Sequence, residues 1–269
     1  MLPWRARLAF GGWLGRMLVG RLPRLRTRVE ANLRHVFPDI GAAERAELVR
    51  AVGDNFGRTF LEIFDLRGFE TARSWTGPSG PGVEALVEAA RSGRGAVIVT
   101  GHLGQWEAGR AWLKSIGIVC AGLYRPLNNA PLNRIYERNL EIGGSPMFPK
   151  SPRGLRRLVG HVAKGGVVAI LTDQYERRAA AFDFIGKPAP TTTFAADLAL
   201  KYDVPLIPAY GIRDPDGFHV AVVIEAPVPR TTPAAMTQAV NDSLAARARA
   251  TPGQYFWLHL RWEKQLAGL

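Results

Sequence analysis

The stretch Gly101-His-Leu-Gly-Gln-Trp-Glu107 holds the residues of this chain whose types and spacing best suit catalysis. Histidine is the usual general base near neutral pH, and a nearby carboxylate can fix its tautomer and stabilise the imidazolium. His102 and Glu107 are too far apart around an ideal helix to face each other, since five residues turn it by about 140°. They can meet only if the chain turns between them, and Gly104 permits such a turn. The alternative is a chance spacing without catalytic meaning.

The elements around this stretch predict where His102 lies. Residues 97–99 form a continuous apolar run, which is typical of a strand buried on both faces. Residues 108–113 have the pattern of a helix start. A strand, a glycine turn and a helix put His102 at the carboxyl end of a strand, where open α/β sheets bind their ligands. This placement strengthens the case for a catalytic pair, with chance spacing still the alternative.

The rest of the chain alternates between helix and strand patterns. Helices are predicted at 82–91, 131–141, 153–163, 193–202 and 233–250, and strands at 96–100, 117–123, 167–172, 204–210 and 218–224. The alternation predicts an α/β fold with a mostly parallel central sheet flanked by helices. The short turn at 212–217 predicts that the last two strands pair antiparallel.

Polar side chains also end two other predicted strands: Arg125 follows one, and Asp173 with Gln174 follows another. Parallel neighbours would bring these ends and His102 to one edge of the sheet. Arg125 could bind a phosphate or carboxylate, stabilise an oxyanion, or form only a surface ion pair. Asp173 could act in catalysis or only bond the backbone amides of its turn. Because a site belongs at this edge, Arg125, Asp173 and Gln174 are candidate substrate-binding residues.

Net charge and composition restrict the classes of partner and of chemical site that this chain can have. The net charge is +12, with 35 basic against 23 acidic residues. Such an excess implies an anionic partner, which could be a phospholipid surface, a nucleic acid or a phosphorylated substrate. A single cysteine, Cys120, excludes an internal disulfide, and the histidines lack metal-ligand spacing. No serine-hydrolase elbow is present, which disfavours a serine hydrolase, and no P-loop or dinucleotide signature appears.

Residues 1–28 contain seven arginines and no acidic residue. Large apolar side chains recur there at helical spacing and share one face: Phe10, Trp13, Leu14, Met17 and Leu18. An apolar face with tryptophan, flanked by arginine, is typical of a helix that lies in a membrane interface. The alternative is a helix packed on the domain with solvated arginines. Three glycines weaken the isolated helix: Gly11, Gly12 and Gly15.

We predict three parts along the chain. Residues 1–28 form a basic, amphipathic, membrane-associating segment, and 29–76 form a helical region that includes a long helix at 42–66. Residues 77–269 form the α/β core. The boundary is placed at 77–82, because this Gly-Pro-Ser-Gly-Pro-Gly run has turn chemistry.

The stretch around His102 resembles the H-x4-D/E motif of membrane glycerolipid acyltransferases. More narrowly, the chain resembles the lipid A biosynthesis acyltransferase family, the late lauroyl and myristoyl transferases. The other matching segments occur in the family's order: Asn32-Leu-Arg-His-Val-Phe-Pro-Asp39, Tyr124-Arg-Pro-Leu-Asn-Asn129, Asp173-Gln174, Phe184-Ile-Gly186, Thr191-Thr-Thr193 and Tyr255-Phe-Trp-Leu-His-Leu-Arg261. This ordered set spans residues 29–263 and is far more specific than the His102 motif alone.

The resemblance implies an enzyme that moves a fatty acyl chain from acyl carrier protein or acyl-CoA to a hydroxyl of a lipid A precursor. His102 would act as general base and Glu107 would orient it, while Arg125, Asp173 and Gln174 would bind substrate. The enzyme would work at the cytoplasmic face of the cell inner membrane, against its anionic surface. Neither a metal nor a cofactor is implied.

The chain departs from the family in two places. Its N-terminal segment is short where family members often begin with a longer apolar anchor, so we expect peripheral attachment. The segment between Glu107 and Arg125 is also short. Because relatives acylate other glycolipids, another glycolipid or a phospholipid is an alternative acceptor. A non-catalytic lipid-binding protein is disfavoured by the intact His102 and Glu107, and no recognition motif supports a nucleic-acid partner.

Overall fold

The computed structural model describes residues 2–72 and 74–262, so the last residues of the predicted core, 263–269, lie outside the described part. Within the described residues, seven strands form one sheet in the order β1-β9-β8-β2-β5-β3-β4. Five adjacent strands, from β8 to β4, run parallel, while β9 is antiparallel to β8. The strands are β1 (Trp75–Ser79), β2 (Ala96–Thr100), β3 (Cys120–Tyr124), β4 (Met147–Pro149), β5 (Val167–Leu171), β8 (Leu206–Arg213) and β9 (Val220–Ile224). The predicted α/β class and the final antiparallel pair are confirmed.

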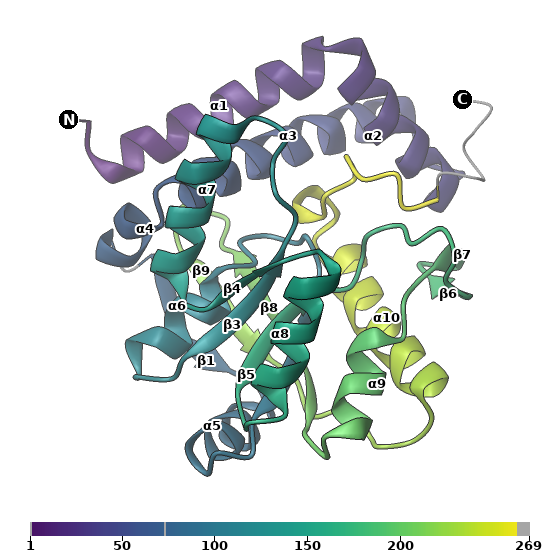
Figure 1. Cartoon of the computed structure of the whole chain (residues 1–269). Helices are drawn as coiled ribbons and strands as arrows, with labels where there is room; N and C mark the ends of the chain where they lie inside the picture. The colour runs from purple at the N-terminus through teal and green to yellow at the C-terminus, as the bar shows by residue number, and fades with distance from the viewer. Residues whose placement is uncertain (1, 73, 263–269) are drawn as a thin grey trace.

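Helices cover both faces of this sheet (Figure 1). Strand β2 is buried along its whole length, because its side chains alternate between two cores. Ile98 packs with residues of α5 and α6, whereas Val97 and Val99 pack with residues of α8, α9 and α10. The helices are α5 (Val83–Arg91), α6 (Ala108–Ser115), α7 (Ala130–Gly143), α8 (Pro152–Val162), α9 (Phe194–Lys201) and α10 (Pro233–Ala250).

The run at 77–82 that we predicted as a turn between two parts overlaps the end of strand β1, which pairs with β9. Gly77 and Pro78 favour a turn, but β1 lies at the edge of the sheet, where a proline without an N–H is tolerated. Strand β4 and the hairpin of β6 (Ala181–Phe184) and β7 (Lys187–Pro190) were also missed. These strands are three or four residues long, too short to show a period.

Helices α1 (Trp4–Arg21), α2 (Pro23–Val36), α3 (Ala42–Phe64) and α4 (Leu66–Ala72) form the N-terminal part, in which α1 runs along α3 (Figure 1). The two backbones approach so closely that a Cβ atom added to Gly15 would lie 2.0 Å from the carbonyl oxygen of Gly53. The glycines of α1 therefore serve close packing, which needs residues without a side chain.

The packing of α1 leaves its aromatic face outside. Phe10 and Trp13 are 55% and 48% exposed, and Leu14 and Leu18 are also exposed. The helix thus rests on the domain, as the alternative stated, and still presents the apolar face that suggested a membrane interface. No helix within the described residues is long and apolar enough to cross a membrane.

Candidate active site

Three neighbouring strands bring the expected polar residues to one edge of the sheet. Strand β5 lies between β2 and β3, and all three are parallel. The carboxyl ends of β2, β5 and β3 lead to His102, Asp173 and Arg125, respectively. Residues separated by up to 71 positions therefore meet at one place, because the strand order sets which ends are adjacent.

His102 is held by Asp173. The Nδ1 atom of His102 lies 2.7 Å from Oδ1 of Asp173, and the backbone N–H of His102 donates to Oδ2 at 2.8 Å. The Asp173 side chain is fully buried, while that of His102 is 14% exposed. Burial opposes ionisation of Asp173, but the charge of His102 and the hydrogen bonds from its ring and backbone outweigh it, so the pKa of Asp173 lies well below its usual range. Asp173 is thus a buried carboxylate that fixes the imidazole.

Glu107 lies in the same region but holds a different partner. Its carboxylate forms a buried ion pair with Arg110, and its backbone N–H donates to the side chain of Gln105 at 3.0 Å. Among the described residues, no hydrogen bond or ion pair joins Glu107 to His102. Arg110 also donates to the carbonyl oxygens of Cys120, Leu140 and Gly144, so this pair joins α6 to the segments around β3 and α7. Its role in orienting His102 stays a prediction.

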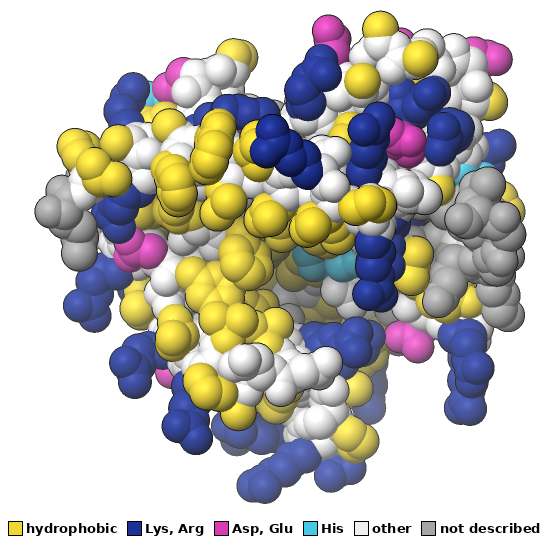
Figure 2. Space-filling model, turned by 90° about the horizontal axis from the view of Figure 1, so that it is seen from above, with side chains coloured by type: hydrophobic (Ala, Val, Ile, Leu, Met, Phe, Trp, Pro, Cys, Tyr) yellow, Lys and Arg dark blue, Asp and Glu magenta, His cyan; other side chains and the backbone are white. Residues whose placement is uncertain are grey.

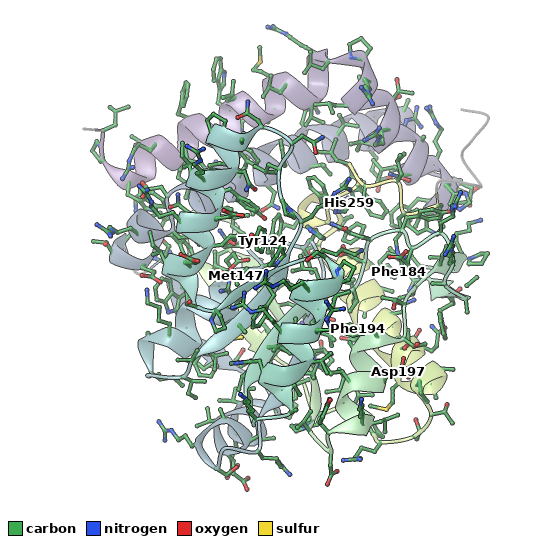
Figure 3. The ribbon with its side chains drawn as sticks, viewed as in Figure 1. Tyr124, Met147, Phe184, Phe194, Asp197 and His259 are labelled. Atoms are coloured by element: carbon green, nitrogen blue, oxygen red, sulfur yellow. The ribbon has the colours of Figure 1, made fainter. Side chains whose placement is uncertain are left out.

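A cavity of about 530 Å³ opens beside His102. Polar residues that line it include Arg125, which is exposed and so lies at the rim, and Gln174. Apolar side chains line much of the rest: Leu123, Leu140, Met147, Leu155, Ile170 and Phe194. Figure 3 shows Tyr124 and Met147 close together beside the central strands, with Phe194 below them. An apolar cavity with a general base at one side and polar groups at its rim suits an apolar chain with a reactive polar end.

A second histidine, His259, was not singled out by sequence reasoning. Its ring centroid lies 4.4 Å from that of His102, and Phe256 contacts both rings. Burial, with a smaller contribution from the charge of His102, lowers the pKa of His259 to about 3. The only sequence signal was its place in the closing segment 255–261. A neutral imidazole therefore packs against the candidate base near neutral pH.

The closing segment also supports the turn that carries Asp173. Arg261 is buried, and its guanidinium donates to the backbone oxygens of Gln174 at 3.2 Å and Pro190 at 2.5 Å. It also donates to the hydroxyl of Thr191 at 2.6 Å. The turn that positions Asp173 is thus fixed from the end of the chain.

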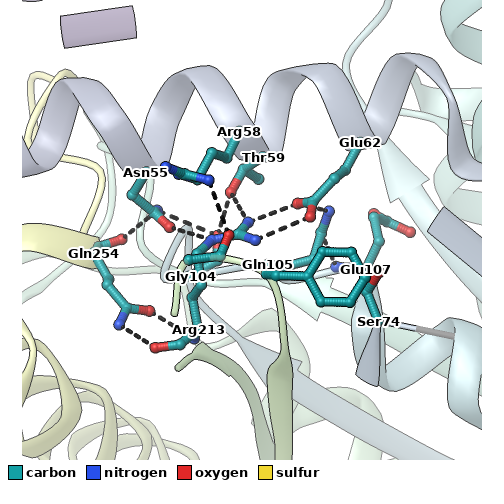
Figure 4. A network of polar contacts seen from close by, with 12 residues as sticks. Asn55, Arg58, Thr59, Glu62, Ser74, Gly104, Gln105, Glu107, Arg213 and Gln254 are labelled. Carbon is teal, nitrogen blue, oxygen red and sulfur yellow. Dashed lines mark hydrogen bonds and ion pairs between the residues drawn. The ribbon is translucent and has the colours of Figure 1, made fainter. Parts of the chain in front are cut away.

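A buried polar network holds the His102 turn against α3 (Figure 4). Arg213 forms an ion pair with Glu62 at 2.6 Å, and Glu62 accepts a hydrogen bond from Gln105 at 2.9 Å. The hydroxyl of Thr59 donates to the backbone oxygen of Gly104 at 2.8 Å. Gly104 has φ of 56°, a conformation that glycine adopts without strain. The sequence predicted α3 only as an amphipathic helix, because these partners come from distant parts of the chain.

The chain is similar over its length to a known protein family and to several of its members. The profile of a family described as bacterial lipid A biosynthesis acyltransferase matches residues 1–264. The chain is 25% identical to a lipid A biosynthesis lauroyltransferase of Escherichia coli, covering 100% of the chain and 89% of the relative. It is 21% identical to a lipid A biosynthesis acyltransferase of Haemophilus influenzae, covering 96% and 81%. It is also 22% identical to a phosphatidylinositol mannoside acyltransferase of Mycolicibacterium smegmatis, covering 89% and 80%.

Proposed function

The chain belongs to the bacterial lipid A biosynthesis acyltransferase family, and we propose that it moves a fatty acyl group from a thioester to a hydroxyl of a lipid A precursor. The family and the names of its relatives support acyltransferase activity on a glycolipid. The observation that carries the proposed chemistry is the pairing of His102 with a buried carboxylate beside an apolar cavity.

In this mechanism Asp173 keeps the proton of His102 on Nδ1, which leaves Nε2 to accept one. Nε2 takes the proton of the acceptor hydroxyl as its oxygen attacks the thioester carbonyl carbon. The tetrahedral oxyanion then collapses, the carbon–sulfur bond breaks, and the imidazolium returns the proton to the leaving thiolate. Asp173 stays ionised throughout and stabilises the imidazolium.

We assign the orienting role to Asp173, because its carboxylate lies within hydrogen-bond distance of the imidazole. Glu107 acts through Arg110 and shapes the cavity wall. At the rim, Arg125 binds an anionic group of the substrate or the developing oxyanion, and Gln174 offers hydrogen bonds to the head of the substrate.

The same proposal includes peripheral attachment to the cytoplasmic face of the inner membrane. Figure 2 shows hydrophobic side chains in a band beside a hollow in which histidine side chains are visible. The exposed large apolar residues come from several elements: Phe10, Trp13, Leu14 and Leu18 on α1, Phe60 on α3, and Leu132 and Ile135 on α7. A bilayer against this band would present lipid hydroxyls to the site. The arginines of residues 1–28 would contact anionic headgroups.

The test is acyl transfer by purified His102→Ala, with a lipid A precursor as acceptor, acyl carrier protein or acyl-CoA as donor, and the product measured by mass spectrometry. A general base contributes about 10²–10⁴ in rate, so the variant should lose at least about a hundredfold. His219→Gln is the matched control, since His219 is an exposed histidine outside the cavity lining. Turnover of His102→Ala near the wild-type value would exclude His102 as the base.

A phosphatidylinositol mannoside is the second candidate acceptor, because relatives with that name match most of the chain. Parallel assays with both acceptors separate the candidates. Acylation of the mannoside alone would replace lipid A as the proposed acceptor and leave the His102 mechanism in place.

A further inference from the structure

We propose that the basic stripe of α8, formed by Arg153, Arg156, Arg157 and Lys164, docks an acidic carrier protein that delivers the acyl thioester. This inference rests on the proposed function, because it gives the donor a place on the surface. The donor is then a thioester carried by a protein rather than a free thioester.

The three arginines share one side of the helix. Gly154, Leu158 and Val162 are buried and define the inner face of α8. All four cations are exposed, and at about 100° per residue Arg153, Arg156 and Arg157 fall within a sector of roughly 100° on the helix. Lys164 lies two residues after Val162, the last helical residue, and extends the basic surface beyond the helix. The stripe is therefore a single strip of positive charge that faces solvent.

Helix stability does not explain this charge. Residues 150–172 contain no aspartate or glutamate, and among the described residues these four cations form no ion pair. Arg157 only packs against the ring of Phe148, 5.4 Å from its centroid. Arg153 stands in the first turn, where the helix dipole disfavours a cation, and it repels Arg157 one turn later. An anionic partner on this strip would offset both the unfavourable interaction of Arg153 with the helix dipole and its repulsion from Arg157.

The stripe begins beside the cavity. Strand β4 is parallel to β3, so it ends at the edge where His102 lies, and α8 starts at Pro152, a few residues after β4 ends. Leu155, in the first turns of α8, lines the cavity, as does Lys150 just before the helix. A thioester on the flexible arm of a protein docked on α8 would therefore enter the cavity past Leu155.

The composition of the stripe favours a polar protein over a membrane. The exposed large apolar side chains of the described residues lie on α1, α3, α7 and connecting segments, and none lies on α8. Interfacial helices combine basic residues with an inserted apolar face, whereas charged strips without such a face steer soluble partners of opposite charge. An acidic carrier protein fits this strip, while the bilayer fits the apolar band.

The experiment compares two donors that carry the same acyl chain: acyl carrier protein, and acyl-pantetheine, which has no charge. With Arg153→Glu/Arg156→Glu, kcat/KM for the carrier donor should fall at least about tenfold, because steering by charge is worth about 10–10³ in association rate. The fall should shrink as salt rises. kcat/KM for acyl-pantetheine should not change.

Arg50→Glu/Arg67→Glu is the matched control. It makes the same change in charge at exposed arginines of α3 and α4, away from α8, and we expect no effect on either donor. The test variant should fold, since an acid in the first turn of α8 complements the helix dipole, and thermal unfolding checks this. Titration of the fluorescently labelled carrier into each protein measures docking without turnover, and only Arg153→Glu/Arg156→Glu should bind more weakly.

Unchanged carrier binding by Arg153→Glu/Arg156→Glu would overturn the inference, and so would an equal loss with both donors. A loss of vesicle binding with unchanged carrier kinetics would assign the stripe to the membrane instead. If the wild type binds the carrier through the stripe but transfers from neither donor, the proposed function fails while the docking site stands.

Discussion

Asp173 contacts His102 twice, through the imidazole Nδ1 at 2.7 Å and through the backbone N–H at 2.8 Å. The first contact fixes the orientation of the ring, and the second fixes the turn that carries it. Because Asp173 follows β5 and His102 follows β2, the pair also ties together the ends of two adjacent strands. The depressed pKa of Asp173 keeps it ionised across the range in which histidine exchanges protons.

The first prediction concerns Asp173→Asn. An asparagine can still accept the backbone N–H of His102, but its amide would donate to Nδ1 and move the ring proton to Nε2. That tautomer cannot take a proton from the acceptor hydroxyl, so kcat should fall about 10²–10⁴-fold. Steady-state kinetics on the folded variant measures this. Glu88→Gln, at an exposed carboxylate of α5, is the control, and near-wild-type kcat in Asp173→Asn would rule out the orienting role.

The second prediction separates Glu107 from catalysis. Glu107→Gln leaves Arg110 buried without its counter-charge, which should cost about 3–5 kcal/mol in the free energy of unfolding. Adding Arg110→Met removes the unpaired charge and should recover most of that loss. Denaturant unfolding of the single and double variants measures both effects.

Turnover of the folded double variant then decides the role of Glu107. Since the contact between His102 and Asp173 is intact there, we expect a loss well short of the roughly 10²–10⁴ that a catalytic acid–base group contributes. A loss of about 10²–10⁴-fold would instead show that Glu107 takes part in catalysis by acting on His102.

Glu107 and Asp173 show which contacts of His102 the sequence could predict and which it could not. Five-residue spacing made Glu107 the visible partner of His102, whereas Asp173 is 71 positions away. The alternation of elements predicted that β2 and β5 would end at one edge. It did not predict their adjacency in register, with Thr100 opposite Leu171, and that register brings Asp173 to the ring. Contacts that depend on register lie beyond what periodicity reports.

The same limit applies to Glu62 and Arg213, a buried ion pair between α3 and β8. A charged residue on an amphipathic helix is expected to face solvent, and only the packed structure shows that Glu62 faces inward. The glycines of α1 were visible in the sequence, but their purpose became clear only when α3 presented Gly53 and Gly57 to them. Short strands such as β4 were missed because three residues carry no period.

The third prediction concerns Arg125→Lys. Arg125 is exposed at the cavity rim and forms no ion pair among the described residues, so its guanidinium is free to bind an anion. Lysine keeps the charge but loses the planar pair of donors. One charge-assisted hydrogen bond is worth about 1.5–3 kcal/mol, so kcat/KM should fall about tenfold or more. Arg134→Lys, on α7 outside the cavity lining, is the control, and full activity in Arg125→Lys would exclude a two-donor contact.

The fourth prediction tests membrane attachment through α1. Phe10 and Trp13 stack at 5.6 Å on the exposed face of the helix, so Phe10→Ser/Trp13→Ser should not destabilise the fold. Each large apolar side chain contributes about 1.5–3 kcal/mol when buried, so vesicle binding should weaken at least about tenfold even at high salt. Co-sedimentation with anionic vesicles across a salt series measures this.

Val119→Ser is the control for this pair, since Val119 is exposed but lies before β3, away from α1. Point substitutions are preferable to removing α1, because Leu8 and Val19 of that helix are buried and their loss would open the core. Binding equal to wild type in Phe10→Ser/Trp13→Ser would place the membrane contact elsewhere on the molecule.

The last prediction is a pH dependence that arises from His259. Its pKa is about 3 in the folded protein, against 6.5 for an unperturbed histidine. Between these two pH values, His259 binds a proton in the unfolded chain but not in the folded protein. The contribution of neutral His259 to stability is therefore complete above pH 6.5 and is lost as the pH falls toward 3. Between pH 7 and pH 5 this linkage lowers the free energy of unfolding by about 2 kcal/mol.

His259→Gln removes that titration, because glutamine carries no ionisable group. The difference in free energy of unfolding between wild type and His259→Gln should therefore shift by about 2 kcal/mol in favour of the variant from pH 7 to pH 5. Urea unfolding of both proteins at each pH measures it, with His219→Gln as the control at an exposed histidine. A difference that stays constant over this range would mean that His259 titrates normally, and that the ring packed against His102 is not held neutral by burial.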